Sequence, residues 1–101
     1  MPKISINVPH ELGQDEAARR LSGLMDAIRN KYKDQIKDLE ETMDGHSGTF
    51  SFKTMGLKVT GAVEVGETEA AINCDLPFAA MMFKGKIEGE IRKQVERLLK
   101  S

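Results

Sequence analysis

The chain has 101 residues, 31% of them charged, and a formal net charge of −1 at pH 7. This length suggests one domain over residues 1–101, and the balanced charge argues against nucleic acid as a partner, because phosphate binding needs a basic excess. The single cysteine, Cys74, excludes an internal disulfide. The N-terminus is too polar for a signal peptide and no apolar run approaches the ~20 residues of a membrane span, so we expect a cytoplasmic protein without a transmembrane segment.

An alternating segment opens the chain. Ile4, Ile6 and Val8 alternate with polar residues, which predicts a half-buried strand that ends at Pro9. A helix is predicted next, from about Gly13 to Lys33, because acidic residues lie in its first turn, where the helix dipole favours them, and apolar residues recur at helical spacing. The residues predicted to face inward are Ala17, Leu21, Leu24, Met25, Ile28 and Tyr32.

Four segments with strand character follow. Residues 35–43 suit either a strand or a longer helix, and we predict a strand because the following residues 44–48 (DGHSG) are a dense turn signal, which needs a strand on each side. Further strands are predicted over residues 49–54, 57–65 and 70–76 from their alternation. Gly61, in the middle of one of them, predicts a β-bulge or a close approach by a helix.

The last quarter of the chain begins with an uncharged apolar segment, residues 76–83 (LPFAAMMF), and continues as an amphipathic helix. The stripe of that helix consists of Phe83, Ile87, Ile91, Val95, Leu98 and Leu99. Gly85 and Gly89 each cost a helix ~1 kcal/mol relative to alanine. We interpret these glycines either as a tolerated weakness or as a site of close backbone packing.

The predicted order is strand, helix, four-strand antiparallel meander, helix, which is an α+β fold. Because the strands alternate rather than being apolar throughout, one face of the sheet is expected to stay wet, with both helices on the other face. The arrangement resembles a reduced helix-grip fold, in which a long C-terminal helix packs across a curved sheet.

No catalytic or metal-binding constellation is visible. The segment Gly45 to Gly48 (GHSG) resembles a nucleophile elbow, but that motif needs its second glycine two residues after the serine. Neither His10 nor His46 has a neighbouring ligand, and Cys74 lies on the presumed core face, which predicts an inert thiol. We therefore expect no catalytic residue, no metal site and no cofactor.

Phe78, Met81 and Met82 are the candidate contact residues for an apolar ligand or partner. One interpretation is a connector whose side chains plug the edge of the sheet. The other is an exposed contact surface, because methionine adapts to irregular apolar partners and exposed apolar patches mark contact sites. We expect Phe78 to be the plug and one of the two methionines to be exposed.

A series of short motifs along the chain resembles a bacterial family. In order they are Pro2-Lys3-Ile4, residues 10–17 with Arg20, Tyr32, the Asp44-Gly45 turn, Phe50-Ser51-Phe52, residues 61–65, Leu76-Pro77-Phe78, and residues 83–88 with Ile91. Each motif alone is weak, but their order and spacing over essentially the whole chain are similar to those of the polyhydroxyalkanoic acid system proteins. Met43 departs from the family pattern, in which a tryptophan is expected before the turn.

The resemblance implies an association with polyhydroxyalkanoate, a carbon reserve held as hydrophobic granules, and it carries no catalytic residue. We expect a non-enzymatic accessory protein that binds the polyhydroxyalkanoate granule, a granule-associated protein or an apolar ligand. A small carrier of hydrophobic acyl ligands, or an enzyme of hydroxyacyl metabolism, is the alternative. A third hypothesis is a structural dimerisation module, a homodimer joined through the methionine-rich segment or a sheet edge.

Overall fold

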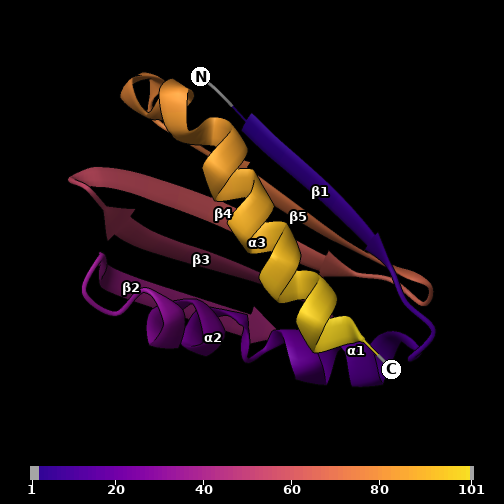
Figure 1. The fold of residues 1–101 in the computed structure, drawn as a ribbon. Coiled ribbons are helices and arrows are strands. Elements are labelled where there is room, and N and C mark those ends of the chain that lie inside the picture. Colours follow the sequence, from indigo (N-terminus) through magenta and orange to yellow (C-terminus); the bar gives the residue numbers. More distant parts are fainter. Residues whose placement is uncertain (1–2, 101) are drawn as a thin grey trace.

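The computed structural model describes residues 3–100, so Pro2 of the first motif and residue 101 of the predicted domain lie outside the described residues. Five strands form one antiparallel sheet in the order β1-β5-β4-β3-β2, and the helices α1, α2 and α3 cover one of its faces (Figure 1). The elements are β1 (Lys3–Pro9), α1 (Gln14–Leu21), α2 (Leu24–Lys31), β2 (Ile36–Asp44), β3 (Ser47–Thr54), β4 (Leu57–Val65), β5 (Glu69–Asp75), the 3₁₀ helix η1 (Phe78–Phe83) and α3 (Lys84–Leu99). The predicted α+β order of elements is confirmed.

The core lies between the helices and the covered face of the sheet. Alternate residues of the strands point into it, as the period of two predicts, and the strand residues buried there include Ile4, Ile6, Val8, Phe50, Phe52, Val59, Val63, Ala70, Ile72 and Cys74. Helix α3 contributes Ile91, Val95 and Leu99, while Ile87 is only half-buried. The long C-terminal helix therefore crosses the sheet as expected (Figure 1).

The prediction of one helix over residues 13–33 is wrong, because the chain breaks at Ser22 and Gly23 into α1 and α2. The Ser22 hydroxyl donates to the Arg19 carbonyl at 2.6 Å, and the Gly23 N–H donates to the Arg20 carbonyl at 3.1 Å in a tighter turn. Serine competes with the helix for backbone partners, and glycine is costly inside one. Leu21 and Leu24 remain buried on either side of the break.

The prediction of a bulge or a helix contact at Gly61 is also wrong. Strand β4 keeps an unbroken register through Gly61, opposite Phe50 on β3 and Cys74 on β5. A Cβ atom at this position would lie 2.3 Å from Cζ of Phe50, so the glycine makes room for the phenyl ring of its cross-strand neighbour. The register instead shifts in the edge strand β2, between Lys37 and Glu40.

The glycines of α3 have no packing role within the chain. Gly85 and Gly89 are both exposed, and a Cβ atom built on either would meet no atom within 4 Å. Of the two interpretations given above, close backbone packing against the described residues is therefore excluded. The other interpretation stands: the two glycines lower the stability of the first half of α3, and the fold tolerates this.

Candidate functional site

Large exposed apolar side chains gather at one end of the molecule. They are Met55 (63% exposed), Phe78 (73%), Met81 (50%), Met82 (90%) and Phe83 (37%). Met55 lies in the turn between β3 and β4, and the other four belong to η1, which follows β5 at the same end of the sheet (Figure 1). We call these five residues the apolar end.

The local sequence of η1 explains why its bulky residues point outward. Pro77 stops β5, and the Ala80 N–H donates to the Pro77 carbonyl at 2.9 Å. Leu76 and Ala80 are completely buried and anchor the segment. A 3₁₀ helix has three residues per turn, so Phe78 and Met81 share a side different from that of Ala80. The prediction that Phe78 plugs the sheet edge is therefore wrong, and both methionines are exposed rather than one.

The turn at Met55 and Gly56 has backbone φ angles of +53° and +76°. Positive φ at both central residues is typical of a type I′ hairpin turn, in which asparagine, aspartate or glycine is preferred. A bulky residue in this left-handed region costs roughly 1–2 kcal/mol. The chain therefore carries an exposed methionine where a polar residue would be both more stable and more soluble.

A small cavity of about 110 Å³ lies beside the apolar end, between α2, α3 and the ends of β2 and β3. Its wall includes Ile28, Phe52, Ile87 and Ile91, and both Met55 and Phe83 reach it. Pockets for small ligands usually measure ~300–1,000 Å³. The space between helix and sheet can therefore take a group of a few carbon atoms, but not a whole drug-sized molecule.

The polar groups at this cavity bind one another. The Tyr32 hydroxyl donates to Oε2 of Glu90, and Nζ of Lys31 lies 3.4 Å from the same oxygen. These contacts join the C-terminal end of α2 to α3. Because the carboxylate of Glu90 already has two partners, the pair is best understood as a link between helices rather than as a free general base.

The residues considered for catalysis have structural contacts away from the apolar end. Nδ1 of His10 accepts the Leu12 N–H at 3.2 Å and Nε2 donates to the Gly66 carbonyl at 3.0 Å, so both ring nitrogens are occupied by backbone partners. The ring of His46 lies 2.7 Å from Oδ1 of Asp15.

Burial raises the pKa of the Cys74 thiol to about 12. The thiol is therefore protonated at neutral pH and cannot act as a nucleophile.

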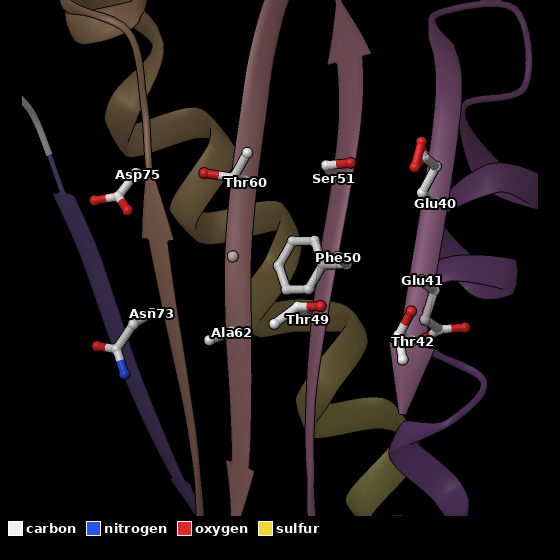
Figure 2. A pocket seen from close by; sticks show the side chains of 11 residues that line it. Glu40, Glu41, Thr42, Thr49, Phe50, Ser51, Thr60, Ala62, Asn73 and Asp75 are labelled. Atoms are coloured by element: carbon white, nitrogen blue, oxygen red, sulfur yellow. The ribbon is translucent and has the colours of Figure 1, made fainter. Parts of the chain in front are cut away.

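The uncovered face of the sheet has a polar hollow of about 430 Å³, with walls from β2, β3, β4 and β5 (Figure 2). Glu40 is opposite Ser51 and Glu41 is opposite Phe50, so the two carboxylates belong to opposite faces of the sheet. Partial burial, and then the carboxylate of Asp26, raise the pKa of Glu41. Within residues 3–100, no group of three or more histidine, cysteine or acidic residues is placed to hold a metal ion.

The sequence pattern did not reveal two features, one at the apolar end and one in the core. Met55 lies outside the uncharged segment that drew attention, and the available signal was its position beside Gly56 in a turn. Gln94 is buried in α3 with no hydrogen-bond partner for its Nε2 among the described residues. No local signal distinguishes this glutamine from an exposed one.

A family model described as "Putative polyhydroxyalkanoic acid system protein" matches residues 4–99 of the chain. The search of curated proteins gives no match. Among solved structures, that of Ara h 8.0201 matches with 10% identity and a TM-score of 0.49, covering 99% of both chains. The ZhuI aromatase/cyclase from Streptomyces sp. R1128 matches with 11% identity and a TM-score of 0.35, covering 96% of this chain and 83% of that one. Neither likeness carries an argument about function. No helix within residues 3–100 has the length and apolar character of a membrane span.

Proposed function

The chain belongs to the putative polyhydroxyalkanoic acid system protein family, and from this premise we propose that it is a non-enzymatic accessory protein that binds an apolar surface of that system. The surface is that of the polyhydroxyalkanoate granule, formed by the polymer or by a granule-associated protein. The contact residues are Phe78, Met81 and Met82, together with Met55.

The exposure of η1 is the observation that carries this proposal. Phe78, Met81 and Met82 lie within five consecutive positions, and each exposes half or more of its surface. Complete burial of a fully exposed side chain of this kind is worth ~1.5–3 kcal/mol. Because the three side chains are 73%, 50% and 90% exposed, covering what remains offers roughly 3–6 kcal/mol before the costs of association. This gain is large enough for reversible attachment to a hydrophobic surface.

The size and contacts of the cavity favour a surface contact over an enclosed carrier or an enzyme. A cavity of about 110 Å³ cannot enclose an acyl chain of several units. Glu90 is occupied by Tyr32 and Lys31, and the Cys74 thiol is protonated at neutral pH. These features support binding of the partner on the surface of the protein rather than inside it.

Dimerisation through the β2 edge of the sheet has less support. This edge strand has its register shift between Lys37 and Glu40, and Asp38 adopts a φ of +52°. Bulges and charged residues on an edge strand disfavour pairing with another strand. The methionine-rich segment is therefore a better candidate than the β2 edge for a contact with a second copy.

A paired substitution tests the proposal. The double variant Met81→Gln with Met82→Gln should keep the melting temperature of the parent protein, because both side chains are exposed. It should bind lipid-free particles of poly(3-hydroxybutyrate) at least ~10-fold more weakly, measured by co-sedimentation, because the lost apolar contact exceeds ~1.4 kcal/mol. Met25→Gln is the matched control in the core, and it should lower stability strongly, because Met25 is only 1% exposed.

Three results would contradict the proposal. The first is parent protein that fails to bind the particles, and the second is a stable double variant that binds them as well as the parent does. The third is enzymatic activity. If the protein turned over a 3-hydroxyacyl thioester, and one substitution abolished this turnover without lowering stability, the chain would be an enzyme.

A further inference from the structure

Lysines surround the apolar end. Lys53 and Lys58 flank the Met55 turn, and the remainder lie at the C-terminal end of α2, at the start of β2 and in the first turn of α3, all at the same end of the sheet (Figure 1). They are Lys31, Lys33, Lys37, Lys84 and Lys86. Lys31 and Lys53 contact the carboxylates of Glu90 and Asp38 at 3.4 and 3.5 Å. Within residues 3–100, no carboxylate lies within 4.0 Å of the ammonium groups of the other five lysines.

The β3–β4 hairpin combines two unfavourable features at its tip. Lys53 and Lys58 are directly opposite in the register of the two strands, and like charges in that position repel each other. Between them Met55 adopts a positive φ and exposes its side chain. Both features destabilise the isolated hairpin, and both become favourable when an external surface supplies negative charge and an apolar environment together.

We propose that the apolar end docks on an anionic lipid surface, with its methionine and phenylalanine side chains entering the acyl region and its lysines contacting the headgroups. This inference concerns the site of the proposed function and goes beyond that function, because it adds an anionic lipid surface as a partner. Lysine suits this position because its long apolar stem can lie in the interface while its ammonium group stays with the headgroups. Attraction of lysines to anionic lipid adds to the burial of apolar side chains.

The shape of the site favours a lipid surface over a folded protein partner. Met82 protrudes with 90% of its surface exposed, and Met55 comes from a separate connection of the chain. A fluid surface can close around separate convex projections, whereas a rigid protein partner would need a matching hollow for each. The small cavity beside them takes only a few carbon atoms, so the acyl chains lie against the molecule rather than inside it.

The charge of the rest of the molecule orients this docking. The formal net charge is −1 although this end is rich in lysine. Acidic residues lie at both ends of the sheet. Asp34 and Asp38 lie beside Met55 and Lys53, and Glu11, Asp15, Glu67 and Glu69 lie in or directly after the β1–α1 and β4–β5 connections at the other end. We expect an anionic surface to attract the lysine-rich end more strongly than the other end, so that binding favours one orientation and weakens with salt.

Flotation with phospholipid vesicles tests the inference. The parent protein should bind vesicles of phosphatidylcholine mixed with phosphatidylglycerol at least ~10-fold more tightly than vesicles of phosphatidylcholine alone, and the preference should fall as the salt rises from about 0.05 M to about 0.5 M. The double variant Lys53→Gln with Lys58→Gln should lose most of that preference without losing stability, because the two lysines repel each other. Lys93→Gln with Lys100→Gln, in the second half of α3 and directly after its last residue, is the matched control and should retain it.

The outcomes separate the inference from the proposed function. Weaker binding of the Lys53 and Lys58 variant to anionic vesicles, with unchanged binding to lipid-free polyester particles, supports the inference. Equal binding to both kinds of vesicle, or equal losses in the test and control variants, overturns it, and so does binding to acidic proteins but to neither kind of vesicle. Failure to bind polyester particles while the anionic preference persists overturns the polymer-surface function and leaves the lipid inference standing.

Discussion

The connecting segments at the two ends of the sheet differ in their polar contacts and in the apolar side chains that they expose. At the end near α1, polar side chains tie the connections together: His10 bonds the Leu12 and Gly66 backbones, and the Gln14 amide donates to the Val65 carbonyl at 2.9 Å. At the apolar end the connections have few such ties and expose methionine and phenylalanine. One end is closed by contacts within the chain, and the other leaves apolar surface that only an external partner can cover.

This difference arises from the connecting segments rather than from the strands. Strands β1, β3, β4 and β5 alternate inward and outward from one end to the other, and α3 runs along the sheet between the two ends (Figure 1). A stable scaffold thus holds both kinds of connection, which makes it feasible to change one end without unfolding the other. Substitutions at matched positions in the two ends test this separation.

The largest effect is expected within α3, on the side that faces the core. Ile91 is 3% exposed, so Ile91→Ala should lower the free energy of unfolding by ~2–5 kcal/mol. Ile87, one turn closer to the apolar end, is half-buried and lines the small cavity, so Ile87→Ala should cost less. Urea unfolding measures the free energy of unfolding of both variants and so compares the two losses. An unchanged melting temperature for Ile91→Ala would show that α3 does not pack on the sheet as described.

A smaller effect is expected at the closed end, from His10. The substitution His10→Ala removes the acceptor of the Leu12 N–H and the donor to the Gly66 carbonyl, and leaving such buried groups unpaired costs ~1–3 kcal/mol. His46→Ala is the control, because the contact between His46 and Asp15 is exposed, and exposed polar pairs are worth ~0–1 kcal/mol. Binding to polyester particles and vesicles should be unchanged in both variants. If a folded His10 variant lost binding, the end near α1 would contribute to the binding site as well as the apolar end.

Alanine at the two α3 glycines should stabilise the protein. Gly85→Ala and Gly89→Ala each place a methyl group where no atom lies within 4 Å, and each should raise the free energy of unfolding by ~0.4–1 kcal/mol. Gly61→Ala is the opposite control, because its Cβ would meet the Phe50 ring at 2.3 Å. Thermal unfolding compares the three variants. If either α3 variant is destabilised, its glycine has a contact that the described structure lacks.

The smallest effect is expected from acid titration of Glu16 in α1. Hydrogen bonds from Arg19 and then Arg20 lower the pKa of Glu16 from 4.5 to about 2. Because the folded pKa lies below the unfolded one, this contribution to stability is present above pH 4.5 and disappears as the pH falls to about 2. Glu16→Gln should therefore be slightly less stable than the parent at neutral pH and equal to it near pH 2. An equal difference in melting temperature at both pH values would contradict this assignment.

The fold was largely predictable because its strands follow a period of two and its last helix a helical period. The break at Ser22 and Gly23 was missed because the apolar spacing continues across it, although serine followed by glycine is itself a turn signal. Glycine occupies position 61 because of its cross-strand pairing with Phe50. Strand register brings distant residues together, and the local sequence does not specify it.

The candidate site was predictable in part. The uncharged segment singled out Phe78, Met81 and Met82, but hydrophobicity does not say which of them the fold covers. The answer depended on Leu76 and Ala80, which occupy the buried positions and leave the larger side chains outside. The cavity, with Met55 and Phe83 both at its wall, arises only when segments far apart in the sequence come together.

The exposed thioethers of Met55, Met81 and Met82 have a chemical consequence of their own. Oxidants convert accessible methionine to its sulfoxide, a polar group that reductases can return to the thioether. Met25, in the core, is almost completely covered, so the sulfurs of the apolar end are oxidised first. A mildly oxidised molecule thus keeps its core and loses the apolar surface of one end. The extent of sulfoxide formation at each methionine therefore reports how far a partner covers that end in the cell.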